Sequence, residues 1–191
     1  MRSLIAALIL LAVPAWAQPQ RYELDPAHTV VSFMIGHVGY SDTLGIFGEV
    51  EGSFTYDMET QQLSDLEVRV ATPSVNTFNR ARDRHVRNGD FLNVSRFPTM
   101  TFTAAGGQPR NASSGTVTGN LTLLGVTRPL TLDVTLNKAA QYPFGHRRFT
   151  LGISARGSLD RSDFGMQYGV ANGLVGDQVD IIIETEAMRM E

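Results

Sequence analysis

Residues 130–136, LTLDVTL, give the clearest structural signal in this 191-residue chain. Apolar residues occupy every second position, and Thr131, Asp133 and Thr135 stand between them. Successive side chains of a β-strand point to opposite faces, so this alternation predicts a strand with one buried and one solvated face. The segment therefore indicates a sheet that covers a core on one side.

The same alternation recurs along most of the chain. It predicts further strands at residues 29–35, 49–56, 63–70, 99–104, 116–124, 148–159 and 178–188. With the first segment they make about eight strands, mostly joined in sequence. Closing such a sheet removes its edges, and about eight strands can enclose one small ligand. We therefore expect an all-β fold, an eight-stranded antiparallel up-and-down barrel; a two-sheet sandwich is the alternative.

Three stretches lack this alternation. Residues 36–45 are rich in turn-forming residues, residues 105–114 read AGGQPRNASS, and residues 160–176 are rich in glycine. Such composition is typical of connections between strands. We expect a turn, a flexible polar loop and a crossover, respectively.

Residues 79–98, NRARDRHVRNGDFLNVSRFP, depart from the β pattern. Four arginines fall within residues 80–87, and neither glycine nor proline occurs in the segment before Gly89. The stretch predicts a helix of about two to three turns that ends at Asn88-Gly89, with the glycine in a left-handed cap. A lone helix in an all-β chain usually covers a barrel end, a sheet edge or a pocket. We therefore expect a short helix and loop that cap the barrel.

The first seventeen residues predict an export signal. Met1-Arg2 is positively charged, residues 4–13 are an apolar run too short to span a bilayer, and Ala15-Trp16-Ala17 resembles a cleavage site. We expect residues 1–17 to be a signal peptide cleaved near Ala17 and residues 18–191 to form one domain in the periplasm. No other apolar run reaches spanning length, so we expect a soluble mature protein.

Composition narrows the classes of function. The absence of cysteine excludes disulfides, thiolate metal sites and a cysteine nucleophile. A formal net charge of −3, with Lys138 as the single lysine, argues against a nucleic-acid partner. The histidines (His28, His37, His85 and His146) lack metal-site spacing, and we find no GxSxG, phosphate-loop, GxGxxG or SxxK motif. We expect no metal, no cofactor and no catalytic residue.

The charged residues of the 79–98 segment allow three interpretations. The arginines could bind an anionic head group such as a phosphate. Asp83 and His85 could be the acid–base pair of an enzyme. The third interpretation is structural: an ion-pair and capping lattice pins the helix to the barrel, with Asp83 and Arg87 facing each other at i, i+4. The residues themselves leave all three open.

A set of short motifs spans most of the chain after the signal. They are HTVVSF at 28–33, HVGYS at 37–41, GIFG at 45–48, SVNT at 74–77, DFL at 90–92, GVTRP at 125–129 and DFGM at 163–166. Together and in this order they resemble the YceI-like family. The resemblance implies a lipocalin-like periplasmic barrel whose apolar interior binds a polyisoprenoid or a related lipid.

The resemblance also favours a lipid tunnel over the packed core that the same aromatic residues would otherwise suggest. The expected contacts to a lipid chain are Phe33, Phe47, Phe54, Phe91, Phe102, Leu121 and Phe149. The expected polar rim is Tyr40, Asn76, Arg82 and His85. We expect a carrier, store or stress-response protein for a polyisoprenoid, an isoprenoid quinone or a long acyl chain such as a fatty amide.

Two alternatives stay open beside the carrier. One is a lipid-modifying hydrolase or isomerase that uses Asp83 and His85, and another is a filled barrel with a structural or interaction role. Dimerisation through the outer face of the barrel would be compatible with each of them.

Overall fold

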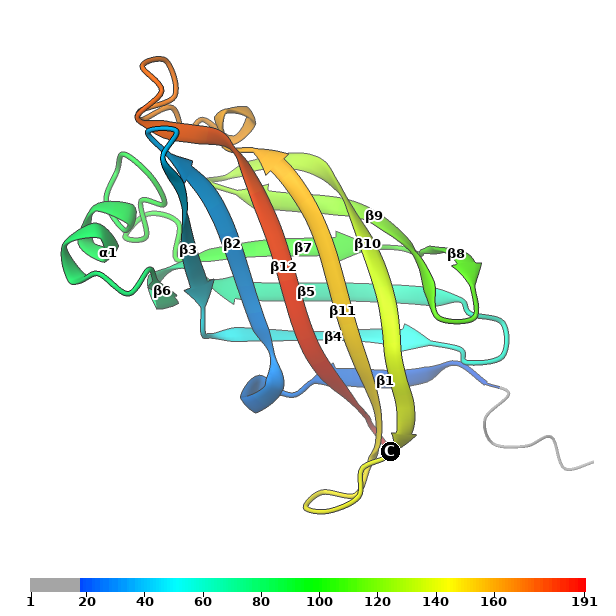
Figure 1. Ribbon diagram of the computed structural model, residues 1–191. Coiled ribbons are helices and arrows are strands. Elements are labelled where there is room, and N and C mark those ends of the chain that lie inside the picture. Colours follow the sequence, from blue (N-terminus) through cyan, green and yellow to red (C-terminus); the bar gives the residue numbers. More distant parts are fainter. Residues whose placement is uncertain (1–17) are drawn as a thin grey trace, which may run out of the picture.

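The computed structural model describes residues 18–191, so the expected signal peptide at residues 1–17 lies outside the described part of the chain. Eight strands form a barrel (Figure 1), with the bounds β1 Gln20–Leu24, β4 Val50–Tyr56, β5 Leu63–Ala71, β7 Thr99–Ala104, β9 Ser114–Leu123, β10 Val126–Gln141, β11 Phe149–Asp160 and β12 Val175–Arg189. They pair in that order, all antiparallel. β1 also pairs with β12, which closes the ring. The expected all-β, eight-stranded antiparallel barrel is confirmed.

Additional strands extend the barrel wall. Their bounds are β2 Val30–His37, β3 Ser41–Phe47, β6 Val75–Asn76 and β8 Gln108–Asn111. A short 3₁₀ turn, Pro26–His28, separates β1 from β2, and both strands pair with β12. In the same way β3 and β4 pair with β2 and β1, respectively. β1 and β2 are therefore two parts of one long strand of the wall, and β3 and β4 are two parts of the strand beside it.

Two stretches that we expected to be irregular contain strands. Within the expected turn at residues 36–45, Gly45 of β3 faces Phe33 of β2, and a Cβ atom at Gly45 would come within 2.1 Å of the Phe33 ring. The ring of Phe33 thus occupies the space that a side chain of β3 would fill. The expected flexible loop at residues 105–114 contains β8, which pairs with the start of β9.

The expected helix is α1, Arg80–Val86, seven residues long. The Asn79 side chain caps it by accepting hydrogen bonds from the backbone N–H groups of Ala81 and Arg82, both at 3.0 Å. The expected left-handed cap at Gly89 is wrong, because the left-handed residue of this connection is Asn93, with φ of 43°. In the described part of the chain, no helix is long and apolar enough to cross a bilayer.

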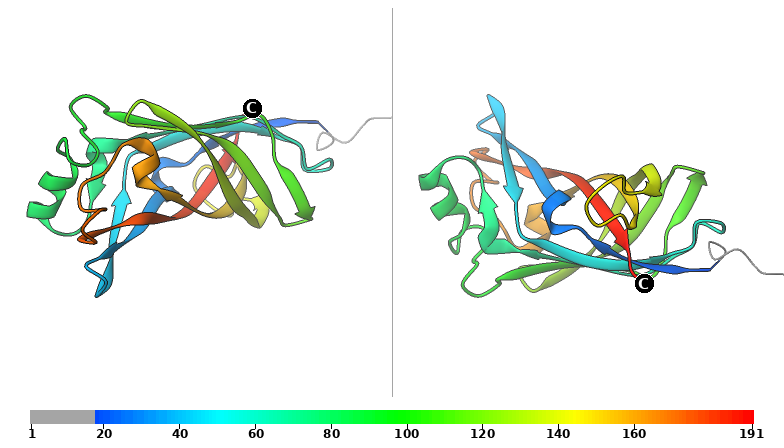
Figure 2. Two further views of the ribbon diagram at one scale, coloured as in Figure 1. Left: turned by 90° about the horizontal axis from the view of Figure 1, so that it is seen from above. Right: turned by 90° about the horizontal axis from the view of Figure 1, so that it is seen from below.

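The two ends of the barrel differ (Figures 1 and 2). Helix α1 and the segment between β11 and β12 lie at one end, and β8 lies at the other. The segment between β11 and β12 joins neighbouring strands, so it is a long hairpin loop and not the expected crossover. We call these two ends the α1 end and the β8 end.

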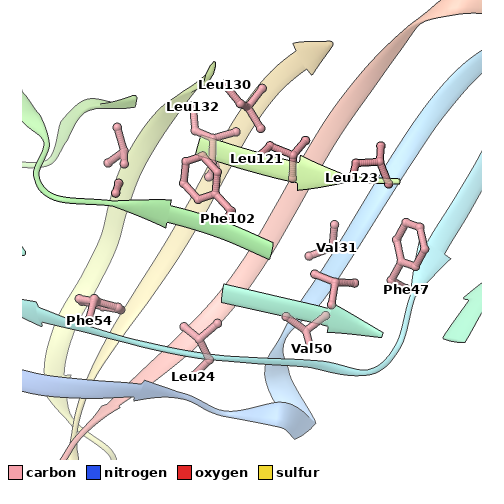
Figure 3. Close-up of a cluster of buried hydrophobic side chains, with 14 of the residues drawn as sticks. Leu24, Val31, Phe47, Val50, Phe54, Phe102, Leu121, Leu123, Leu130 and Leu132 are labelled. Carbon is pink, nitrogen blue, oxygen red and sulfur yellow. The ribbon is translucent and has the colours of Figure 1, made fainter. Parts of the chain in front are cut away.

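The alternating residues of each strand divide between the inside and the outside of the barrel, as the sequence indicated. On β10, Leu130 and Leu132 are buried while Thr131 is exposed. Figure 3 shows these leucines together with Phe102 of β7 and Leu121 of β9, all pointing into the barrel. The inward faces of the strands thus form one continuous apolar lining.

Candidate functional site

An apolar cavity of about 770 Å³ occupies the barrel interior. Small-molecule sites typically measure about 300 to 1,000 Å³, so the space suits a bound ligand. Along β11 the lining runs from Leu151 to Leu159, roughly 26 Å at about 3.3 Å per residue. A filled barrel, one of the alternatives from the sequence, would leave no such space.

The cavity lining reaches both ends of the barrel. At the α1 end it includes Arg82 and His85 from the helix, and Tyr168 from the β11–β12 loop. At the β8 end it includes Gln108 and Asn111 of the hairpin. The cavity is therefore an elongated tunnel with an apolar wall and polar groups near each end.

Most of the expected ligand contacts line this cavity. Six of the seven expected chain contacts belong to its wall: Phe33, Phe47, Phe54, Phe91, Phe102 and Leu121. Two residues of the expected rim, Arg82 and His85, line it at the α1 end. Their positions suit the expected roles, and their contacts with a ligand remain a prediction.

Three expected site residues lie away from the lining, which corrects the sequence-based placement. Phe149 precedes Leu151, the first residue of β11 that lines the cavity. The guanidinium of Arg189 lies 5.3 Å from the ring centre of Phe149. Tyr40 stands on the β2–β3 hairpin with 90% of its surface exposed. Asn76 is exposed, and its side-chain oxygen accepts a hydrogen bond from the backbone N–H of Phe78.

An aromatic cluster with a histidine at its centre lines the α1 end of the cavity. The ring of His85 meets Phe91 and Tyr168 edge-on, with centroid distances of 5.0 and 4.8 Å. The Nε2 atom of His85 lies 3.0 Å from a carboxylate oxygen of Asp90. This cluster gives the α1 end both an apolar surface and a polar group. Sequence reasoning missed Tyr168, since it belongs to a glycine-rich loop without periodicity.

A buried arginine also lines the α1 end. Arg161, at the end of β11, is 1% exposed, and its guanidinium donates hydrogen bonds to four backbone carbonyls between residues 166 and 176. It also lies 5.7 Å from the ring centre of Phe91. Burial lowers the pKa of Arg161, and the charge of Asp177 acts in the opposite direction. The guanidinium holds the β11–β12 loop in place and contributes positive charge to this end of the cavity.

The charged side chains of the 79–98 segment do attach the helix to the barrel, as the structural interpretation expected, but through other partners than the expected Asp83–Arg87 pair. Asp83 is buried and accepts hydrogen bonds from the backbone N–H and the hydroxyl of Thr77, at 2.7 and 2.6 Å. Arg82 donates to the hydroxyl and the carbonyl of Thr77, and Arg87 donates to the Pro73 carbonyl. The side chains thus attach α1 to the barrel through the segment before it, and no Asp83–Arg87 hydrogen bond is formed among the described residues.

The proposed acid–base pair of Asp83 and His85 does not form, because the two side chains have different partners. Asp83 bonds to Thr77, whereas His85 bonds to Asp90. Burial raises the pKa of Asp83, but the Thr77 hydrogen bonds and the charges of Arg87 and Arg82 together lower it below its usual value. A carboxylate held in its ionised form by two donors is poorly suited to proton transfer.

One group in residues 18–191 could place three donor atoms around a metal ion. Its donor atoms, from Asp25, His28 and Glu186, lie within 4.8 Å of one another. His28 Nδ1 is 2.7 Å from Asp25 and 3.7 Å from Glu186. The hydrogen bond with Asp25, and then the charge of Glu186, raise the pKa of His28, so these contacts favour an ion-paired histidine. Sequence spacing could not show this group, since Glu186 comes from the other end of the chain.

Comparison with known proteins places the barrel in a family. A family model described as a YceI-like domain matches residues 22–187. The UPF0312 protein of Yersinia enterocolitica is 36% identical over 185 residues, which cover 97% of this chain and 94% of that protein. The crystal structure of the Campylobacter jejuni YCEI protein has a TM-score of 0.73 and 29% identity, over 82% of this chain and 90% of that chain.

A more distant structural neighbour shares the fold alone. It is a polyisoprenoid binding domain from Saccharophagus degradans that is implicated in plant cell wall breakdown. It has a TM-score of 0.64 and 15% identity, over 88% of this chain and 98% of its own. The family match spans nearly all of the described barrel, and the Yersinia relative exceeds 30% identity along nearly the whole chain. The chain therefore belongs to the YceI-like family.

Proposed function

We propose that this protein binds a polyisoprenoid, an isoprenoid quinone or a long acyl chain inside the barrel, and that it carries or stores this lipid. The observation that carries the proposal is the elongated apolar cavity of about 770 Å³. The naming of the Saccharophagus degradans neighbour as a polyisoprenoid binding domain supports this ligand class. The role is non-catalytic, since removing apolar surface from water is sufficient for binding.

The energy of burying a lipid chain is large enough for this role. Each buried methylene group contributes about 0.8 kcal/mol, so ten would contribute roughly 8 kcal/mol before the loss of chain freedom. A net binding free energy of that size corresponds to a Kd of about 1 μM, and a longer chain adds methylene groups that offset the loss of freedom. Binding strength should therefore follow the length of chain that the cavity can hold.

The polar end of the lipid lies at the α1 end in this proposal. Arg161 supplies buried positive charge there, and His85 and Tyr168 supply polar atoms beside an aromatic wall. A carbonyl or phosphate group would be favoured next to these residues, whereas the rest of the lining would favour a hydrocarbon chain. The lipid tail would extend toward the β8 end.

The proposed location is the periplasm, after removal of residues 1–17. Its support is the charged start, the apolar run and the small-residue cleavage site of the sequence. N-terminal sequencing of protein recovered from the periplasmic fraction tests this point. A chain that begins at Gln18 is expected, and a chain that retains Met1 in the cytoplasm would contradict it.

A chain-length series tests the ligand class. Lipid-free protein is titrated by calorimetry with isoprenoid alcohols and fatty amides of increasing length. We expect affinity to rise about fourfold per added methylene and then to level off once the cavity is full. Affinity that is independent of chain length, or no binding at any length, would contradict the proposal.

A further inference from the structure

Large apolar side chains are exposed around the α1 end of the barrel. They are Val38, Tyr40, Phe78, Tyr168 and Leu174, and we call them the apolar rim. The backbone N–H of Val38 bonds to the carbonyl of Leu174, and the ring of Tyr168 contacts His85 of α1. Figures 1 and 2 show the β2–β3 hairpin, the β11–β12 loop and α1 at this same end. Exposed apolar groups that gather in one place mark an interaction surface.

Two rim residues are held in a conformation that is unfavourable for their side chains. Phe78 has φ of 64° and Val38 has φ of 52°, both in the left-handed region that glycine and asparagine adopt more readily. Val38 and Gly39 form the tip of the hairpin, a position where Asn-Gly would be unstrained. Phe78 is nevertheless 67% exposed. Strain that presents apolar side chains to solvent indicates a role outside folding.

Positive charge is concentrated beside the apolar rim. Residues 79–98 contain five arginines and two aspartates, although the whole chain has a net charge of −3. Arg80 and Arg84 lie on the exposed surface of α1, and neither side chain has a hydrogen-bond or ion-pair partner in residues 18–191. These two guanidinium groups are therefore available to an external anion.

The rim and the cavity share residues. Val38, Tyr168 and Leu174 are exposed at the surface and also line the cavity. A lipid that entered between them would pass from an outside surface to the interior along apolar side chains. Three of the five rim residues therefore border the cavity at the α1 end.

We propose that the apolar rim docks on a lipid bilayer that contains anionic lipid, and that it holds the cavity entrance against the membrane. Tyr40 and Phe78 would enter the head-group region, where aromatic residues are favoured, and Arg80 and Arg84 would contact lipid phosphates. This inference rests on the proposed lipid binding, and it names the membrane surface as the source or destination of the ligand.

Vesicle flotation tests the docking surface. The purified protein is mixed with phosphatidylcholine vesicles that contain phosphatidylglycerol, and with pure phosphatidylcholine vesicles. We expect binding to the anionic vesicles. The Arg80→Gln/Arg84→Gln variant should lose about 30-fold in vesicle binding, at about fivefold per arginine near an anionic surface. Arg147→Gln, an exposed arginine on the β10–β11 hairpin away from the rim, is the matched control and should change nothing.

A second variant separates docking from folding. In Val38→Asn/Phe78→Asn both left-handed positions receive a residue that tolerates them, so Tm should rise by about 4 °C. Vesicle binding should nevertheless fall about 100-fold, because the apolar rim loses two of its apolar side chains. Phe144→Ser on the β10–β11 hairpin removes an equally exposed phenylalanine, 65% against 67%, and should leave vesicle binding intact.

Ligand uptake is measured separately, in detergent without vesicles. Uptake in detergent together with loss of vesicle binding in the rim variants supports both proposals. Uptake in detergent without vesicle binding, or equal losses in the control variants, would overturn the docking surface and leave the lipid-binding function standing. Rim-dependent vesicle binding without uptake would support docking and refute lipid binding inside the barrel.

Discussion

A substitution that fills the cavity gives the sharpest test of the lipid-binding barrel. Ala155 lies in the middle of β11 and lines the cavity. Val134 and Ile183, its partners on the two neighbouring strands, line it as well. In Ala155→Trp the indole would project into the space that we assign to the lipid chain.

The expected effect follows from the methylene groups that the indole displaces. If about five are displaced at about 0.8 kcal/mol each, the binding free energy weakens by about 4 kcal/mol, which is about a thousandfold in Kd. The free energy of unfolding of the lipid-free protein should change by less than about 1 kcal/mol, because the indole enters empty space. In a packed core the same change would cause overpacking, which typically costs about 1 to 3 kcal/mol.

The assay pairs calorimetric titration with chemical denaturation of lipid-free protein. Thr135→Trp is the control. Thr135 is exposed on the outside of β10, so this substitution adds the same ring system to the surface and not to the cavity. We expect it to leave both quantities nearly unchanged. Strong destabilisation of Ala155→Trp would refute the cavity, and unchanged lipid affinity in a stable variant would refute its assignment to the ligand.

Further predictions concern the framework of the barrel. Gly119→Ala should lower the free energy of unfolding by about 2 kcal/mol, since the added Cβ atom would lie 2.4 Å from a carbonyl oxygen of the neighbouring strand. Gly48→Ala is the control: its added Cβ atom would have no neighbour within 4 Å, so the free energy of unfolding should change by less than about 0.5 kcal/mol. Arg161→Met should cost about 3 kcal/mol in denaturation, because four carbonyls lose a buried donor. The pKa of His28 is raised in the folded protein, first of all by its hydrogen bond with Asp25. This pairing therefore stabilises the fold fully at pH values below the unfolded pKa of about 6.5, and the contribution is lost as pH rises through the folded pKa. His28→Asn should therefore remove a step from the pH profile of Tm, and a profile that keeps the step would assign it to another group.

The strands that sequence reasoning found are those with one apolar face. The prediction at 99–104 coincides with β7, where alternate residues contact the core. β3 escaped detection because Gly45 interrupts its inward face, and the Phe33 ring that fills the space comes from the neighbouring strand. β8 is exposed at each of its four positions and is held by pairing with β9, so it has no apolar pattern to detect.

The same reasoning explains which of the expected residues line the cavity. Alternation tells which face of the sheet a residue occupies, and the resemblance to the family favoured a cavity over a packed core; Phe33 and Phe102 do line the cavity. It does not tell how far along the barrel a residue lies, and Phe149 falls beyond the end of the lining. Arg161 and Tyr168 come from the β11–β12 loop, whose path depends on hydrogen bonds from a buried guanidinium and not on any periodic pattern.

Native mass spectrometry tests the central claim most directly. The protein is purified from the periplasm of its host without delipidation, and the bound material is extracted with organic solvent and identified. We predict a discrete adduct whose extract is a polyisoprenoid, an isoprenoid quinone or a long acyl chain. A ligand-free mass that stays unchanged after incubation with isoprenoids, quinones and fatty amides would contradict the account.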